Sequence, residues 1–134
     1  MRYMMMIKAN PSYEAGKPPN PALIEAMGRL SEEMTRAGAM LSVGGLMPSS
    51  AGTRIRLDNG KRSVTDGPFT ETKELVGGYA ILQAASRDEA LALAQRCVDV
   101  HAACGVTDFE LEIRPMWDMA QGCAEPAASA AGRA

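Results

Sequence analysis

One short segment of the chain gathers side chains that could carry out acid–base chemistry. Residues 64–74 read VTDGPFTETKE, with Thr65 and Asp66 placed directly before a Gly-Pro pair. A carboxylate held by a rigid turn beside a cleft can serve as a general base or as a ligand anchor. The plainer explanation is turn chemistry, because an Asp side chain accepts backbone N–H bonds two residues on and Pro fixes φ. We therefore carry Asp66 forward as the candidate catalytic residue, with both explanations open.

Three residues are candidates for binding a ligand near that carboxylate. Thr65 would supply a hydroxyl beside Asp66, and Arg54 could meet an anionic group through its planar guanidinium. Tyr79 follows Gly77 and Gly78, and glycines inside a strand often mark close approach by another backbone or a ligand. Each residue also has a purely structural explanation. Thr65 would be an ordinary β-branched strand residue, Arg54 would lie on the solvent side of an edge strand, and Tyr79 would be a core tyrosine with its hydroxyl at the rim. The candidate ligand-binding residues are Thr65, Tyr79 and Arg54.

A second group of residues has the types and spacing of metal ligands. Cys97, His101 and Cys104 fall at steps of four and three, so on a continuous helix they share one face. Thiolates and an imidazole bind zinc, with a water or Cys123 as the fourth ligand. Cysteine is equally a small buried hydrophobic residue, and this spacing is far less specific than paired CxxC motifs. We expect no metal and no cofactor, and these three residues are the outside candidates.

The composition bounds the class of protein. The chain has 134 residues, enough for one domain with a real core, and its formal net charge is −2 without a basic stripe. Nucleic acid is therefore a poor partner, because phosphate binding concentrates Lys and Arg. No apolar run approaches the roughly 20 residues that a membrane span needs. An odd count of three cysteines and no recognisable export signal predict reduced thiols and a cytoplasmic protein.

Two amphipathic helices must position these residues. Asn20 offers an N-cap oxygen and Pro21 suits the first helical position, while Gly38 is a natural C-terminal stop. Residues 86–89 read SRDE, a capping box that starts the second helix. The predicted buried face of the first helix consists of Leu23, Met27, Leu30 and Met34, and that of the second of Ala90, Leu91, Ala94, Cys97 and Val98.

Strands fill most of the remaining chain. Asn59-Gly60 between two alternating runs is a strong hairpin signal. The predicted strands cover residues 3–7, 40–47, 53–57, 62–65, 77–84 and 109–115, and a long loop follows the first. The order strand, helix, strand, hairpin, strand, helix, strand predicts an α+β domain. Two right-handed crossovers give it a ferredoxin-like βαββ(β)αβ topology, an antiparallel sheet with two helices on one face.

The other face of the predicted sheet needs a cover. In residues 3–7 and 79–82 nearly every position is apolar, and a strand that is apolar on both sides is buried on both sides. Two helices cover only one face. We therefore expect a homodimer that packs sheet to sheet.

Several long strings resemble the DGPF branch of the YCII-related proteins. They are RYMMMIKA, LSVGGLMPSSAGTRIRL, GKRSVTDGPFTETKELVGGY and LEIRPMWD, and together they cover most of the chain. Residues 98–107 and the segment from about residue 121 fall outside the pattern. The resemblance implies a dimeric α/β-barrel. We expect one domain over residues 1–119 and an Ala/Gly/Ser-rich tail over residues 120–134.

The resemblance does not deliver a reaction. Most DGPF relatives have no assigned activity, some wider YCII relatives are thought to use a His-Asp pair, and some DGPF proteins are associated with sigma factors. Asp66 lies in the matching motif, but His101 is the single histidine and lies in the divergent segment. The first expectation is a homodimer with a small-molecule cleft near Asp66, with turnover left open. The alternative is a regulatory or interaction module that controls transcription through a protein partner.

Overall fold

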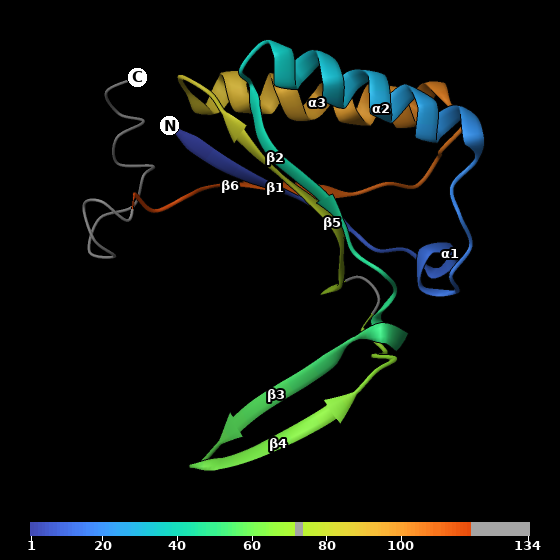
Figure 1. Ribbon diagram of the computed structural model, residues 1–134, viewed down its shortest axis with the longest axis vertical. Helices are drawn as coiled ribbons and strands as arrows, with labels where there is room; N and C mark the ends of the chain where they lie inside the picture. Colours follow the sequence, from blue (N-terminus) through green and yellow to red (C-terminus); the bar gives the residue numbers. More distant parts are fainter. Residues whose placement is uncertain (72–73, 119–134) are drawn as a thin grey trace.

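The computed structural model describes residues 1–71 and 74–118, and this part of the chain is a mixed α+β domain (Figure 1). Its elements, in chain order, are β1 (Arg2–Lys8), α1 (Pro11–Glu14), α2 (Pro21–Arg36), β2 (Met40–Gly45), the 3-10 helix η1 (Ser49–Ala51), β3 (Thr53–Asp58), β4 (Lys61–Asp66), β5 (Val76–Gln83), α3 (Arg87–Ala103) and β6 (Leu111–Pro115). The predicted α+β class is confirmed. The predicted tail, residues 120–134, lies outside the described residues.

One sheet of the described chain has the strand order β2-β5-β1-β6, and every neighbouring pair is antiparallel. Met5 in β1 lies opposite Ala80 on one side and Ile113 on the other. Helices α2 and α3 lie side by side over one face of this sheet (Figure 1). The predicted antiparallel sheet with both long helices on one face is therefore confirmed.

The helix boundaries follow the capping signals in the sequence. The Asn20 side chain accepts a hydrogen bond from the backbone N–H of Leu23 at 2.7 Å, and Ser86 does the same for Glu89 at 3.2 Å. Gly38 adopts a φ of 74°, which ends α2 as predicted. None of the helices in the described ranges is both long and apolar enough to cross a membrane.

The core lies between the two long helices and the sheet. Its largest fully buried side chains are Tyr3, Met34, Leu82 and Cys97. Of the predicted face of α2, Leu23, Leu30 and Met34 are buried, and Met27 packs against the core with part of its surface exposed. The Tyr3 hydroxyl is buried and finds no hydrogen-bond partner among the described residues. Within the described residues, the core therefore leaves this polar atom unsatisfied.

The predicted buried face of α3 is wrong at Leu91, and the side chain of Val98 is only partly buried. Ala90, Ala94 and Cys97 are buried, but the side chain of Leu91 is 39% exposed. Leu91 is rotated by about 100° from Ala90, because a helix has about 3.6 residues per turn. Leu93 packs against the core instead. Small residues line the contact face, so α3 can approach the sheet closely.

The expected long loop after β1 contains a helix that the sequence reading missed. The side chain of Asn10 accepts a hydrogen bond from the backbone N–H of Tyr13 at 2.8 Å, and Pro11 opens α1. This is the same Asn-Pro signal that starts α2 at Asn20. Only four residues follow it, too few for the helical periodicity that identifies a longer helix.

Strands β3 and β4 form a hairpin, here called the arm (residues 53–66), that extends away from the rest of the fold (Figure 1). The turn lies at Asn59 and Gly60, with φ of 50° and 81°, so the predicted hairpin is confirmed. All twelve strand residues are exposed. Because an isolated two-stranded hairpin is marginally stable in water, its base must be held by other contacts.

Candidate functional site

The base of the arm packs tightly against η1. Residues 66–69, here called the DGPF loop, leave β4, and the backbone N–H of Gly67 donates to the carbonyl of Gly52 at 2.9 Å. A Cβ at Gly67 would lie 1.8 Å from the carbonyl oxygen of Ser49, so no other residue fits there without a shift of the backbone. The glycine of the DGPF loop therefore serves close packing between two backbone segments.

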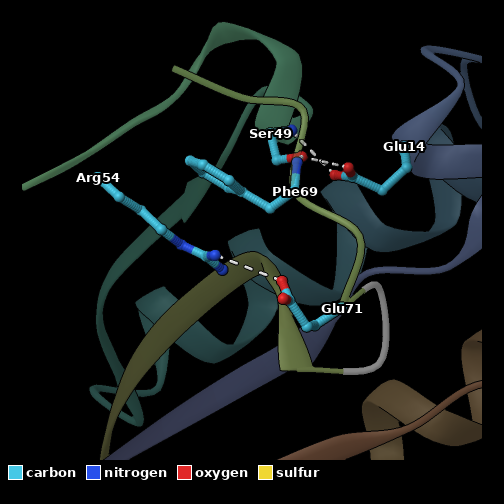
Figure 2. Close-up of polar contacts among 5 residues, drawn as sticks. All are labelled: Glu14, Ser49, Arg54, Phe69 and Glu71. Carbon is cyan, nitrogen blue, oxygen red and sulfur yellow. Dashed lines mark hydrogen bonds and ion pairs between the residues drawn. The ribbon is translucent and has the colours of Figure 1, made fainter. Parts of the chain in front are cut away.

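A hydrogen-bonded chain ties the DGPF loop to α1 (Figure 2). The carboxylate of Glu14 accepts from the backbone N–H of Ser49 at 2.9 Å and from the Ser49 hydroxyl. The same hydroxyl accepts from the backbone N–H of Phe69 at 2.9 Å. Hydrogen bonds to an ionised carboxylate are stronger than neutral ones. Three segments that are far apart in the sequence are thus fixed relative to one another.

Arg54 contacts the other side of the same loop. Its guanidinium lies over the ring of Phe69, 3.8 Å from the ring centre, and its Nη1 is 3.3 Å from a carboxylate oxygen of Glu71 (Figure 2). The pKa of Glu71 is lowered, first by a hydrogen bond from its own backbone N–H and then by Arg54. The guanidinium that we expected to bind a ligand is therefore engaged by side chains of its own chain.

Asp66 lies at the end of β4 and is exposed, with one carboxylate oxygen 3.0 Å from the hydroxyl of Thr53. Thr65 lies opposite Arg54 in the register of the arm. Adjacent strand residues point to opposite faces, so Asp66 and Thr65 face different sides of the arm. The structure thus brings Thr65 and Arg54 onto one face and leaves Asp66 on the other, and the catalytic role of Asp66 stays a prediction.

Tyr79 lies on β5, in the four-stranded sheet. Its ring covers Gly44 of the neighbouring strand, where a Cβ would come within 2.8 Å of the tyrosine ring. Gly77 makes similar room for Tyr13, whose hydroxyl donates to the Gly77 carbonyl at 2.8 Å. Gly78 lies against another backbone, since a Cβ there would come within 3.3 Å of the Gly44 carbonyl oxygen. The close approaches at Gly77 and Gly78 are thus made by residues of the same chain, and a ligand-binding role of Tyr79 stays a prediction.

A cavity of about 860 Å³ lies between α2 and the sheet, next to α1 and the segment that follows it. This volume is within the roughly 300–1,000 Å³ of small-molecule sites. Tyr79 lines it, whereas Asp66, Thr65 and Arg54 do not. The lining residues are mostly apolar. Those from β1, α1 and the segment up to α2 are Met5, Ile7, Lys8, Asn10, Ser12, Tyr13, Lys17, Pro18, Pro19 and Asn20, and those from α2 are Leu23, Ile24, Met27, Gly28, Leu30, Ser31 and Met34. Strands β2 and β5 add Met40, Val43, Gly44, Gly45, Gly77, Gly78, Tyr79 and Ala80, and α3 and the segment after it add Cys97, His101, Val106 and Phe109.

The charged side chains in the lining of this cavity have one sign, although Lys8 pairs with Glu112 outside the lining. Lys8, Lys17 and His101 are the basic side chains of its lining, and within the described residues the lining contains no Asp or Glu. The sequence reading missed this cavity because its walls come from segments that each read as core or loop. The Asn-Pro pair at Asn10 was the available signal, since it predicts a helix at the rim.

Cys97 and His101 lie in the wall of the cavity. Burial raises the pKa of the Cys97 thiol to about 11, so the thiol is uncharged at neutral pH. The Nδ1 of His101 is 2.8 Å from the backbone carbonyl of Cys97, and its ring stacks on Phe109 with centres 3.8 Å apart. Within the described part of the chain, no three His, Cys, Asp or Glu side chains are grouped to hold a metal ion. Within that part of the chain Cys97, His101 and Cys104 therefore do not form such a group, and Cys123, the fourth expected ligand, lies outside the described residues.

Two comparisons place the chain among known proteins. The sequence profile described as the YCII-related domain matches residues 1–116, which include the arm, the DGPF loop and the cavity. An uncharacterized protein of Rhizobium meliloti (strain 1021) is 32% identical over 90 residues, which is 67% of this chain and 69% of that protein. Both matches extend well beyond a single motif.

Proposed function

This chain belongs to the YCII-related family, and we propose that it binds an apolar small molecule with an anionic group in the cavity between α2 and the four-stranded sheet. The observation that carries the proposal is the lining of the cavity. It is mostly apolar, and its charged or ionisable wall groups include Lys8, Lys17 and His101 but no carboxylate within the described residues. Such a site favours a ligand that carries a negative charge on an apolar body.

The two lysines differ in how a ligand could use them. The Lys8 side chain is 17% exposed and lies 3.4 Å from a carboxylate oxygen of Glu112, so its charge is already partly balanced. Lys17 is exposed, in the segment between α1 and α2. We assign Lys17 to the anionic group of the ligand. The methionines of the wall, including Met27 and Met34, suit an apolar body because their side chains adapt to its shape.

We propose further that the protein is a homodimer in which the open faces of the two four-stranded sheets pack against each other. Met4 and Ile81 are register partners on adjacent strands, and both are partly buried although they lie on the face opposite the core residues Tyr3 and Leu82. Partly exposed apolar side chains at the centre of a sheet support a covering partner. A second copy supplies the same surface in a two-fold arrangement.

A catalytic cleft near Asp66 remains a proposal within this dimer. Asp66 lies on the arm, outside the residues that line the cavity, and it accepts a hydrogen bond from the hydroxyl of Thr53. A site at Asp66 would need groups from a second subunit to enclose a substrate. Turnover that is lost in Asp66→Asn, while ligand binding in the cavity persists, would support it.

The alternative function is an interaction module that acts in transcription control through a protein partner. The observation that favours it is the exposed apolar side chains of the arm, Ile55, Leu57 and Val64. Apolar patches of this kind mark interaction surfaces. The two proposed functions make different predictions for the cavity. The first requires a bound small molecule there, and the alternative requires none.

The test compares two tryptophan variants of α2. Met27 lines the cavity, and Met27→Trp would fill part of it, whereas Glu32 points to solvent on the same helix, so that Glu32→Trp is the matched control. Thermal unfolding is measured with decanoate, naphthoate and their uncharged amides. We expect the acids to raise the Tm of the wild type and of Glu32→Trp but not of Met27→Trp. No shift in the wild type, or equal shifts in both variants, would refute the proposal.

A further inference from the structure

We infer that the arm is an intersubunit element: its apolar face packs against the sheet of a second copy of this chain. The inference rests on the homodimer proposed above and adds the surface that makes the contact.

The arm has an apolar face that its own chain leaves open. Ile55 and Val64 are register partners, so their side chains share one face, and Leu57 lies two residues further along that face. These side chains are 75%, 67% and 69% exposed, respectively. The same face carries Thr53 and Asp66 at its base and Arg62 opposite Leu57, and the opposite face carries Arg54, Arg56 and Ser63. One side of the ribbon is therefore built to be covered.

The contacts at the base hold the arm away from its own sheet. The hydrogen bonds from Glu14 through Ser49 to Phe69 and the contact of Arg54 with Phe69 fix the DGPF loop. From this base the arm extends outward, with β3 and β4 beyond the end of the four-stranded sheet (Figure 1). An arm fixed in this direction presents its apolar face to another molecule rather than to its own core.

A second copy supplies a matching surface. In the proposed dimer the partner's sheet covers Met4 and Ile81, and beside that contact the edge strand β2 and the segment after it leave the side chains of Leu41 and Met47 exposed for the arm. In a two-fold dimer each copy gives one arm and receives one. A strand of six residues is about 20 Å long. Each copy therefore contributes both an arm and a sheet face to the contact, and stable dimers bury roughly 800 Å² per partner.

The charges of the arm and of the rest of the chain are complementary. The arm contains four basic side chains (Arg54, Arg56, Lys61 and Arg62) and two acidic ones (Asp58 and Asp66), which gives it a net charge of +2. The rest of the chain holds the other ten basic and fourteen acidic residues, a net charge of −4. An arm of one copy is therefore attracted to the body of another. Nucleic acid is a less suitable partner for the arm, because the acidic body would repel its phosphates. A bound nucleic acid would also leave the apolar side chains of Ile55, Leu57 and Val64 uncovered.

The first test measures self-association of the full-length chain by sedimentation velocity across a concentration series. Ile55→Glu places a charge on the apolar face, and Ser63→Glu places the same charge on the opposite face as the matched control. We expect a dimeric wild type, a Kd at least about tenfold weaker in Ile55→Glu, and a change within about twofold in Ser63→Glu. Circular dichroism confirms that both variants are folded, since both positions are exposed.

The remaining outcomes separate this inference from the dimer itself. A monomeric wild type would overturn both. A dimer that survives Ile55→Glu but dissociates in Ile81→Glu would retain the sheet-to-sheet dimer and overturn the role of the arm. A monomeric wild type that binds a DNA duplex and loses that binding in Ile55→Glu would identify the arm as a nucleic-acid contact instead.

A second test identifies the partner surface directly. A photo-crosslinking amino acid replaces Leu57 at the exposed face, and the dimer is prepared from a mixture of isotopically light and heavy chains. We expect mixed-isotope crosslinks that join the arm to residues 40–47, or to the adjacent strand 76–83, of the other copy. Crosslinks confined to single-isotope pairs within one chain would overturn the inference.

Discussion

The hydroxyl of Ser49 accepts a hydrogen bond from the backbone N–H of Phe69 at 2.9 Å, across twenty positions of sequence. The same hydroxyl donates to Glu14, so one small side chain joins α1, η1 and the DGPF loop (Figure 2). The hydroxyl thus holds Glu14 of α1 and Phe69 of the DGPF loop at fixed distances from η1. The arm starts from this junction of three segments. The junction therefore determines where the arm points.

Removing that hydroxyl should weaken the junction. In Ser49→Ala the partly buried N–H of Phe69 loses its acceptor, which we expect to lower the free energy of unfolding by about 1–3 kcal/mol. Urea denaturation measures the loss, and faster hydrogen exchange of the Phe69 amide locates it. Ser50→Ala, at an exposed neighbour, should change stability by less than about 0.5 kcal/mol. Equal stability of the two variants would contradict the role assigned to Ser49.

Gly67 should tolerate no side chain. A Cβ there would lie 1.8 Å from the Ser49 carbonyl oxygen, so Gly67→Ala must displace the loop from η1, at a cost of about 3 kcal/mol. Gly28→Ala is the contrasting variant, because a Cβ in α2 at that position meets nothing within 4 Å. Alanine favours helices over glycine, so this variant should gain about 1 kcal/mol. Thermal unfolding of both proteins checks the opposite signs.

The unsatisfied hydroxyl of Tyr3 predicts a stabilising substitution. Tyr3→Phe removes a buried polar atom without a partner among the described residues, and we expect a gain of about 1 kcal/mol. Tyr13→Phe provides the comparison, because the Tyr13 hydroxyl donates to the Gly77 carbonyl at 2.8 Å. That variant should lose about 1 kcal/mol. A destabilised Tyr3→Phe protein would show that the hydroxyl has a partner in solution, such as a bound water.

Stability at alkaline pH should depend on Cys97. In the folded protein burial keeps the thiol protonated up to a pKa of about 11, whereas an unfolded thiol titrates near its ordinary value of 9.0. Between these values the folded state binds more protons than the unfolded state, so this contribution is complete below pH 9 and is lost as pH rises toward 11. Urea denaturation from pH 8 to pH 10.5 measures the slope.

The control for this pH dependence removes each thiol in turn. Cys97→Ala should show a shallower fall of stability with pH than the wild type. Cys104→Ala, which lacks the thiol at the end of α3, should keep the steeper wild-type fall. A Cys97→Ala protein with the wild-type slope would assign the alkaline transition to other groups.

The sequence predicts those parts of the fold that depend on local signals. Asn20-Pro21 and Ser86 start the two long helices, and Asn59-Gly60 turns the arm, because each of these effects acts within a few residues. The prediction that Leu91 is buried was wrong, because an apolar residue can fit the helical spacing of a buried face in the sequence without facing the sheet in the fold. The rotation of a helix about its axis is set by packing partners that are distant in the sequence.

The candidate site divides in the same way. The turn role of the DGPF segment follows from its residue types, but its dependence on Ser49 and Glu14 joins residues that no local pattern connects. The cavity is harder still to predict. Its lining is drawn from α1, α2, α3 and three strands, so the basic character of Lys8, Lys17 and His101 emerges only after folding.

The period of the arm limits how its length can vary in evolution. Because successive side chains alternate between its two faces, adding or removing two residues in each strand would keep Ile55, Leu57 and Val64 together on one side. A change of one residue in each strand near the base would turn that side over and present Arg54 and Arg56 in its place. Arms of different length in related proteins should therefore differ by even numbers of residues per strand.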